Sequence, residues 1–217
     1  MATLVDKFIT FTNITDVREK LLRWLQFFIV FITIWFPQST LLLQLKSQIL
    51  IIRKVLRCFK PLQHANIAYK GYYSSNADYL FILKNICFML YLGADQIVLL
   101  RMLNMIPKNN FSLVQVPKFA NIFWLTALSV DIRVNLNTIK YLDEEKSDKV
   151  ISTKEKLQQK KIRRRTWYIS VRKLIWDILD TYIVSTYLQY MKSYNLLIGV
   201  FGMITSTLAM QDIWNKC

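Results

Sequence analysis

The segment from Lys46 to Lys70 carries a hydrophobic stripe and a basic stripe on the same helical repeat. Residues three and four positions apart share one face of an α-helix, so the segment is predicted to be an amphipathic helix that Pro61 kinks or ends. The apolar face holds Ile49, Ile52, Val55, Leu56, Phe59 and Leu62, and the opposite face holds Lys46, Arg53, Lys54, Arg57, Lys60 and His64. This division is typical of helices that lie flat in a membrane interface, with cations toward lipid phosphates.

The same stripe also fits the core face of an ordinary globular helix. Two features favour the membrane. The polar face is almost purely basic, and the apolar face is built from large aliphatic side chains and Phe59. We therefore predict that Ile49, Ile52, Val55, Leu56, Phe59 and Leu62 insert into a membrane. The residues predicted to bind headgroups of anionic lipid are Lys46, Arg53, Lys54, Arg57 and Lys60.

The overall composition agrees with a membrane protein. Hydrophobic residues make up 53% of the chain, yet its net charge is +15. Glycine and proline are scarce, and no run of alternating apolar and polar residues indicates a strand. The predicted fold is all-α, a membrane-associated bundle of amphipathic and apolar helices with one or two candidate transmembrane segments.

Further helices follow from the apolar pattern. Asp16 with Glu19 resembles a capping box that opens a helix, which becomes apolar all round from Phe27 to Phe36. The next predicted helix, 79–103, is apolar but contains Asp95, which needs a partner such as Arg101 if the helix spans a membrane. Another helix begins over 119–130. Segment 194–210 has no charged residue and is the best spanning candidate.

The change of composition around residue 143 divides the chain. Region 1–142 is predicted to be an N-terminal amphipathic membrane-remodelling helical region, and region 167–217 a C-terminal helical region with the membrane segment 194–210. Between them lies the charged linker 143–166, whose basic run from Lys154 to Arg165 is either solvated or in contact with lipid headgroups. No nucleic-acid-binding fold accompanies this charge, so no nucleic-acid partner is predicted.

No catalytic, cofactor-binding or metal site is predicted. His64 is the only histidine and lies among cations, which favours a solvated or interfacial side chain. Asp177 and Asp180 share a helix face, but no further ligand completes a metal shell, so capping or ion pairing is expected of them. The three cysteines show no metal-ligand spacing. The protein is predicted not to be an enzyme.

Several stretches, in a shared order, resemble the fungal eleventh peroxin, the peroxisomal membrane-elongation factor. The resemblance covers nearly the whole chain, although Val17 stands where that family has a glycine before its early arginine–glutamate–lysine motif. The matching stretches are Arg18-Glu19-Lys20-Leu21-Leu22-Arg23, 53–62, Asp95-Gln96 with Leu100-Arg101, 172–177 and 210–214.

The resemblance implies a peroxisomal membrane protein that elongates and tubulates the organelle, promoting peroxisome fission and proliferation. It also implies self-association as a homo-oligomer and cooperation with a dynamin-like fission GTPase and its tail-anchored adaptor. Delivery would depend on the import receptor for peroxisomal membrane proteins.

Three hypotheses follow for the activity. In the first, the amphipathic helix is a wedge that adds area to the cytosolic leaflet and bends the bilayer. In the second, the chain is a small-solute pore or transporter whose polar path uses charges inside apolar stretches, namely Asp95, Arg101, Asp131 and Arg133. In the third, it is a structural tether that recruits the fission apparatus.

Overall fold

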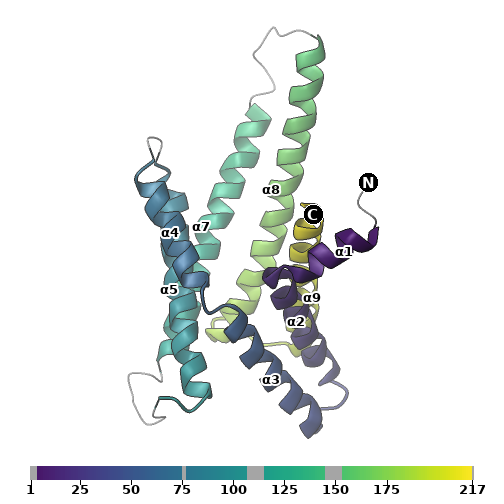
Figure 1. Cartoon of the computed structure of the whole chain (residues 1–217), viewed down its shortest axis with the longest axis vertical. Coiled ribbons are helices and arrows are strands. Elements are labelled where there is room, and N and C mark those ends of the chain that lie inside the picture. Colours follow the sequence, from purple (N-terminus) through teal and green to yellow (C-terminus); the bar gives the residue numbers. More distant parts are fainter. Residues whose placement is uncertain (1–3, 75–76, 107–114, 145–152, 217) are drawn as a thin grey trace.

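The computed structural model describes residues 4–74, 77–106, 115–144 and 153–216, and the regular elements in these ranges are α-helices. Figure 1 shows their arrangement as a bundle in which the α7–α8 pair extends furthest at one end and α3 inclines away at the other. In order, the helices are α1 (Leu4–Asn13), α2 (Thr15–Ile32), α3 (Thr40–Leu56), α4 (Lys60–Tyr72), α5 (Tyr79–Met102), α7 (Val116–Glu144), α8 (Thr153–Tyr187) and α9 (Asn195–Trp214). The predicted all-α fold is confirmed.

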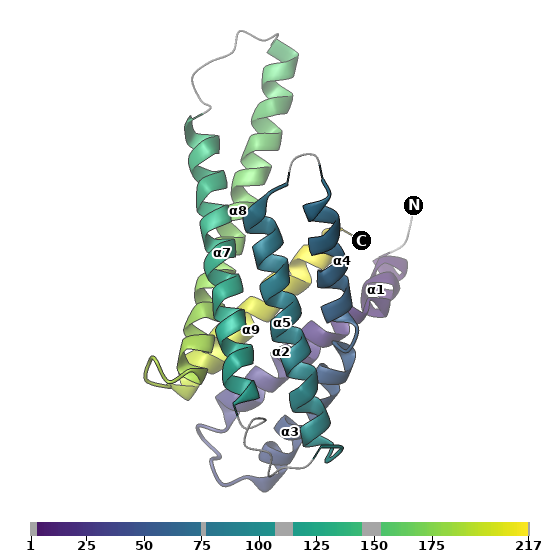
Figure 2. The ribbon, with the colours of Figure 1, turned by 90° about the vertical axis from the view of Figure 1, so that its left-hand side faces the viewer.

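The helices pack mainly as antiparallel neighbours. Helix α2 lies along α9, α5 lies between α4 and α7, and α8 contacts both α7 and α9 (Figures 1 and 2). An apolar cluster of Phe27, Val30, Ile183 and Ile198 joins α2, α8 and α9. Regions 1–142 and 167–217 therefore share this core, while the predicted division of the chain into domains stays a prediction.

Helix α9 approaches α2 closely because its contacting face is made of small residues. Gly202 lies against the ring of Phe27, and Gly199 lies against Phe31. Thr205 and Ser206, one turn further on, are fully buried. Small residues at a helix interface let two backbones come together, which is a common packing mode of membrane helices.

The distribution of polarity differs from that in a water-soluble bundle, because paired charges share the interior with the apolar core. Charged side chains occupy the interior, although Lys, Arg, Asp and Glu are rarely buried unless they are paired. Large apolar side chains, in contrast, are exposed on each described helix. The buried charged residues are Glu19, Arg23, Arg53, Lys54, Arg57, Asp95, Arg172, Asp177 and Asp180. An apolar exterior of this extent indicates a surface that faces lipid.

Among the described residues, α5 and α9 are long and apolar enough to cross a membrane by length and composition. Helix α9 contains the predicted segment 194–210, and α5 agrees with the helix predicted over 79–103. The break at Pro61 is also confirmed, since α3 ends at Leu56 and Pro61 lies in the first turn of α4.

Two boundary predictions are wrong. Asp16 and Glu19 do not form a capping box, because the N-cap of α2 is Ile14 and Glu19 is buried in the interior instead. The helix predicted to begin over 119–130 is α7, which starts earlier and continues to Glu144. Of the linker 143–166, residues 145–152 lie outside the described residues, and residues from 153 onward belong to α8.

The close approach of α9 to α2 gives a first prediction. A Cβ atom at Gly202 would overlap the ring of Phe27, so Gly202→Ala should force the helices apart. We expect a loss of about 1–3 kcal/mol in the free energy of unfolding, as for other overpacked cores. Thermal unfolding of the detergent-solubilised protein measures it.

The matched control is Gly93→Ala in α5, where an added Cβ meets nothing within 4 Å. Alanine favours the helix by about 0.8–1.0 kcal/mol over glycine, so this variant should be unchanged or more stable. Equal melting temperatures for Gly202→Ala and wild type would contradict the packing described.

Candidate functional site

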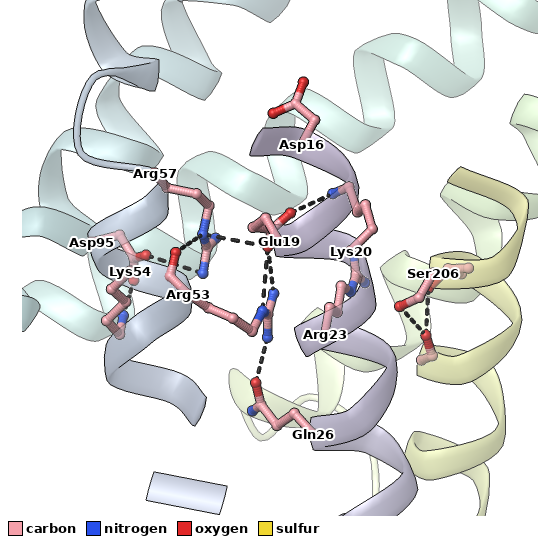
Figure 3. Close-up of polar contacts among 12 residues, drawn as sticks. Asp16, Glu19, Lys20, Arg23, Gln26, Arg53, Lys54, Arg57, Asp95 and Ser206 are labelled. Carbon is pink, nitrogen blue, oxygen red and sulfur yellow. Dashed lines mark hydrogen bonds and ion pairs between the residues drawn. The ribbon is translucent and has the colours of Figure 1, made fainter. Parts of the chain in front are cut away.

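The basic face of α3 points into the protein, where it meets a carboxylate of α2. Arg53 donates hydrogen bonds from Nη2 and Nε to Oε1 of Glu19, at 2.9 Å and 3.3 Å, and a further one from Nη1 to the side-chain oxygen of Gln26 (Figure 3). Lys20 also pairs with Glu19, at 3.1 Å. Glu19 is 1% exposed, so these cations replace its water.

A second carboxylate, that of Asp95 on α5, pairs with the other two buried cations, Lys54 and Arg57. Lys54 forms an ion pair with Asp95, and Nη2 of Arg57 lies 3.5 Å from the other oxygen of Asp95. Arg57 also lies 3.6 Å from Glu19 and donates to the hydroxyl of Tyr91 at 3.1 Å. We call Glu19, Arg53, Lys54, Arg57 and Asp95 the ionic network. It joins α2, α3 and α5 (Figure 3).

Electrostatics keeps the Glu19 carboxylate charged despite its depth. Burial alone would raise the pKa of Glu19, but Lys20, Arg53 and Arg57 together lower that pKa well below its usual value. Burial lowers the pKa of Lys20 to about 8, against the opposing effect of Glu19. The carboxylates and the cations of the network are thus both charged. Each buried charge is stabilised by its oppositely charged neighbours in place of water.

The apolar face predicted to insert into a membrane lies mostly on the outside. Phe59 is 74% exposed and Leu62 is 67% exposed, and Ile52 and Val55 are exposed to about half their area. Leu56 is half-buried, and Ile49 is buried at 3% exposure. Four of the six predicted side chains are therefore exposed, two on α3, one at the N-cap of α4 and one on α4, and we call Ile52, Val55, Phe59 and Leu62 the outer stripe.

Of the five residues predicted to bind lipid headgroups, three are buried and two are half-buried. Arg53, Lys54 and Arg57 are buried, and they pair with carboxylates of the protein instead of the predicted lipid phosphates. Lys46 and Lys60 are half-buried, and Lys60 lies 2.7 Å from Asp16 at the start of α2. Headgroup binding stays a prediction, and in this conformation Lys46 and Lys60 are the members of the set closest to the surface.

His64 is not the solvated or interfacial side chain predicted. Its Nδ1 lies 3.0 Å from the side-chain oxygen of Asn85, and its ring stacks on Phe88 with centroids 5.2 Å apart. Both contacts are on α5. His64 therefore fixes α4 against α5.

Beside the ionic network lies a cavity of about 490 Å³ between α2, α3, α5, α7 and α8. Asp95 and Asp131 line it, whereas Arg101 and Arg133 do not. Its other charged lining residues are Glu19, Lys20, Arg23, Arg53, Lys54, Arg57, Lys60, Lys173, Asp177 and Asp180.

Two carboxylates of α8, Asp180 and Asp177, also line the cavity. Arg23 donates to Asp180 at 2.5 Å, which confirms the ion-pair role predicted for Asp180. Asp177 accepts a hydrogen bond from Asn135, and burial, with the charges of Asp131 and Asp180, raises its pKa to about 8. Within the ranges described, no three His, Cys, Asp or Glu side chains converge to hold a metal ion.

Sequence reasoning missed Glu19, Gln26 and Tyr91 as partners of the basic face. It also proposed Arg101 for Asp95, where the structure places Lys54 and Arg57. The sequence around Glu19 gave no clear signal of these partners, because Lys20 and Arg23 of the same helix are nearer in sequence.

Comparison with known proteins identifies the family. The family described as Peroxisomal biogenesis factor 11 (PEX11) matches residues 5–214. The chain belongs to the PEX11 family. It is thus a non-enzymatic protein of the peroxisomal membrane, as predicted from the resemblance.

The relatives of this PEX11-family chain match along nearly their full length. It is 33% identical to peroxisomal membrane protein PMP27 of Saccharomyces cerevisiae, over 97% of this chain and 94% of that protein. It is 28% and 30% identical to peroxisomal membrane proteins PMP30A and PMP30B of Candida boidinii, over 98% of this chain and 94% of each relative. No solved structure matches the chain significantly.

The ionic network of this PEX11-family protein gives a second prediction. Glu19→Gln leaves Arg53 and Arg57 buried without their shared carboxylate, and breaking a buried pair in this way costs about 3–5 kcal/mol. We expect a corresponding loss in the free energy of unfolding, measured by chemical denaturation in detergent.

The control for this variant is Asp16→Asn, which removes a carboxylate from the same helix. The Asp16 side chain is 54% exposed and its pair with Lys60 lies at the surface, so the variant should cost about 0–1 kcal/mol. Equal losses of unfolding free energy for Glu19→Gln and Asp16→Asn would contradict the view that the buried ionic network stabilises the fold more than a surface ion pair does.

Proposed function

We propose that this protein elongates and tubulates the peroxisomal membrane by inserting the outer stripe of α3 and α4 into the cytosolic leaflet, and so promotes division. The observation that carries the proposal is the outer stripe itself: large apolar side chains of two successive helices, exposed above cations that are already paired inside. Because Arg53, Lys54 and Arg57 are already paired with carboxylates inside the protein, these cations do not have to be desolvated when the stripe meets acyl chains.

The energy available from insertion is substantial. Moving a large apolar side chain from water into an apolar medium is favourable by about 1.5–3 kcal/mol, and the outer stripe contains four such residues. Side chains that enter one leaflet add area to that leaflet only. The bilayer then curves toward the side of insertion, which is the deformation that a tubule requires.

Anionic lipid has a secondary part in this proposal. Lys54 and Arg57 are buried and paired with Asp95 within the protein, so they are held away from a charged surface. Exposed cations of α8, namely Lys160, Lys161, Arg164 and Arg165, are free of burial and suit an anionic surface better. Self-association, the dynamin-like GTPase with its tail-anchored adaptor, and the peroxisomal import receptor remain proposals from the family resemblance.

A second candidate function, a small-solute pore or transporter, is favoured by the charged cavity. Its lining includes Asp95 and Asp131, two of the four residues singled out for a polar path. The two functions separate in reconstituted vesicles, because a pore releases an entrapped small solute from vesicles that keep their spherical shape. Tubulation without release supports the wedge.

The outer stripe gives a third prediction. Phe59→Glu places a charge at its most exposed position, where the side chain has no core to disturb. We expect the purified full-length variant to lose most of its tubulation of vesicles that contain anionic lipid, with an unchanged helical content by circular dichroism. Electron microscopy of the vesicles measures tubule formation.

The control is Tyr141→Glu on α7, which exchanges another aromatic residue of 63% exposure for the same charge. It lies outside the outer stripe and should tubulate vesicles as the wild type does. Normal tubules with Phe59→Glu, or a similar loss with Tyr141→Glu, would refute the role given to the outer stripe.

A further inference from the structure

The cavity beside the ionic network carries more positive than negative charge on its walls. Among the described residues that line it, seven are Lys or Arg and five are Asp or Glu. Lys60 and Asp131 also pair with residues outside the lining, Asp16 and Lys84, and the charges of these two partners cancel. The walls therefore carry an excess of two positive charges.

The excess is concentrated where α2, α3 and α5 meet, because four cations there share two carboxylates (Figure 3). These residues are Lys20, Arg53, Lys54 and Arg57, with Glu19 and Asp95. Elsewhere on the walls, Arg23 pairs with Asp180, and Lys173 lies about one turn before Asp177 on α8. Charges that are removed from water need a full complement of counter-charge. This part of the cavity therefore favours an additional anion.

Lys20 shows the shortage of negative charge directly. Its pKa falls to about 8 because burial, together with the positive charges of Arg23 and Lys60, outweighs the attraction of Glu19. Its amine lies 5.8 Å from the centre of the Trp176 ring, on the cavity side of α8. An anion that binds beside Lys20 would stabilise the charged form of this amine.

The cavity is open to the surface near these cations. Lys173, which lines it, is exposed, and Lys20 and Lys60 are half-buried. Lys20 approaches Trp176, which follows Lys173 by about one helical turn. An anion that enters from this side therefore meets amines before it reaches the buried guanidinium groups of Arg53 and Arg57.

A phosphate monoester matches the excess charge. It carries about −1.5 to −2 at pH 7 and presents three acceptor oxygens, so one ligand neutralises both charges. Lysine and arginine bind such oxygens through charge-assisted hydrogen bonds. The volume of about 490 Å³ suits a small organic ligand. Tyr91 and Trp124, whose stacked rings lie 5.4 Å apart, give the organic part an apolar wall.

We propose that the cavity binds a phosphate monoester between α2 and α3, with Lys20 as the first cation to contact it. The ester is either a soluble molecule or the headgroup of a lipid such as phosphatidic acid. Glu19 and Asp95 do not exclude the anion, because three cations surround Glu19 and two surround Asp95. The proposal goes beyond membrane insertion, since it uses no residue of the outer stripe.

Thermal unfolding of the full-length protein in dodecyl maltoside, an uncharged detergent, tests the proposal with two probes. Glycerol 3-phosphate carries the phosphate monoester in soluble form, and dioleoyl phosphatidic acid carries it on a lipid. Sodium chloride at equal ionic strength is the control for the first probe, and dioleoyl phosphatidylcholine is the control for the second. We expect at least one probe to raise the melting temperature by several degrees, because a ligand of the folded state stabilises that state.

Lys20→Gln removes the cation from the site, while Glu19 keeps Arg53 and Arg57 as partners and the fold is retained. We expect this variant to bind the probe about ten- to hundredfold more weakly, the loss expected of one charge-assisted hydrogen bond. Lys20→Arg should restore binding. Lys161→Gln is the matched control, because Lys161 is an exposed cation of α8 outside the lining of the cavity, and it should bind as the wild type does.

A second variant avoids any doubt about folding. Lys173 is exposed, so Lys173→Gln leaves the interior intact and should weaken binding by a smaller factor than Lys20→Gln.

The outcomes also identify the source of the ester. A rise with glycerol 3-phosphate indicates a soluble ligand, and a rise with phosphatidic acid alone indicates a lipid; either supports the proposal if Lys20→Gln weakens it. No rise with either probe, an equal rise with the matching control, or unchanged affinity in Lys20→Gln would overturn it. Phe59→Glu should bind the probe normally, so a failure of this proposal is seen separately from a failure of the wedge.

Protection of Lys20 from acetylation, followed by mass spectrometry, places the ligand in the cavity. The bound probe should slow modification of Lys20 several fold and leave the exposed Lys192 unaffected. A rise in melting temperature with an unchanged rate at Lys20 would place the ligand elsewhere and would overturn the proposal.

Discussion

The pairing of buried cations with buried carboxylates controls the architecture of this protein. A charged group removed from water needs a counter-charge, and Glu19 and Asp95 supply it to three basic residues of α3. Because Glu19 belongs to α2 and Asp95 to α5, this requirement brings three helices together and fixes how α3 is rotated. Once its basic face is turned inward, most of the opposite face is left exposed and provides the outer stripe.

A surface of this kind needs an apolar partner, and the peroxisomal membrane supplies one. The interior contains paired charges beside an apolar core, whereas many large aliphatic and aromatic side chains are exposed, among them the four of the outer stripe. The close contact of Gly202 with Phe27 is also a mode of packing that does not depend on exclusion of water. Membership of the PEX11 family agrees with this physical picture, and the mechanical role proposed for the outer stripe gives the exposed surface a use.

The positions of most helices could be predicted from the sequence, but not which face of each helix is turned toward the protein. Pro61 marked the break between α3 and α4, and the charge-free segment 194–210 marked α9. The stripe periodicity identified the two faces of α3 correctly, but not which of them met the protein, because the partners of Arg53 and Lys54 lie 34 and 41 residues away. Glu19 was assigned to a capping box for the same reason, since its true partners are distant in sequence. His64 likewise shares a face with cations in the sequence. Its contacts with Asn85 and Phe88 follow only from the position of α5 in the fold.

The central claim is that Arg53, Lys54 and Arg57 of the basic face are paired with carboxylates inside the protein. Lysine acylation, followed by mass spectrometry on the full-length protein in anionic vesicles, tests it most directly. Lys54 is 6% exposed and paired with Asp95, whereas Lys70 on α4 is exposed. The account predicts that an amine-reactive ester modifies Lys54 far more slowly than Lys70. Equal rates at the two lysines would contradict it, because they would place the cations of α3 at the membrane surface.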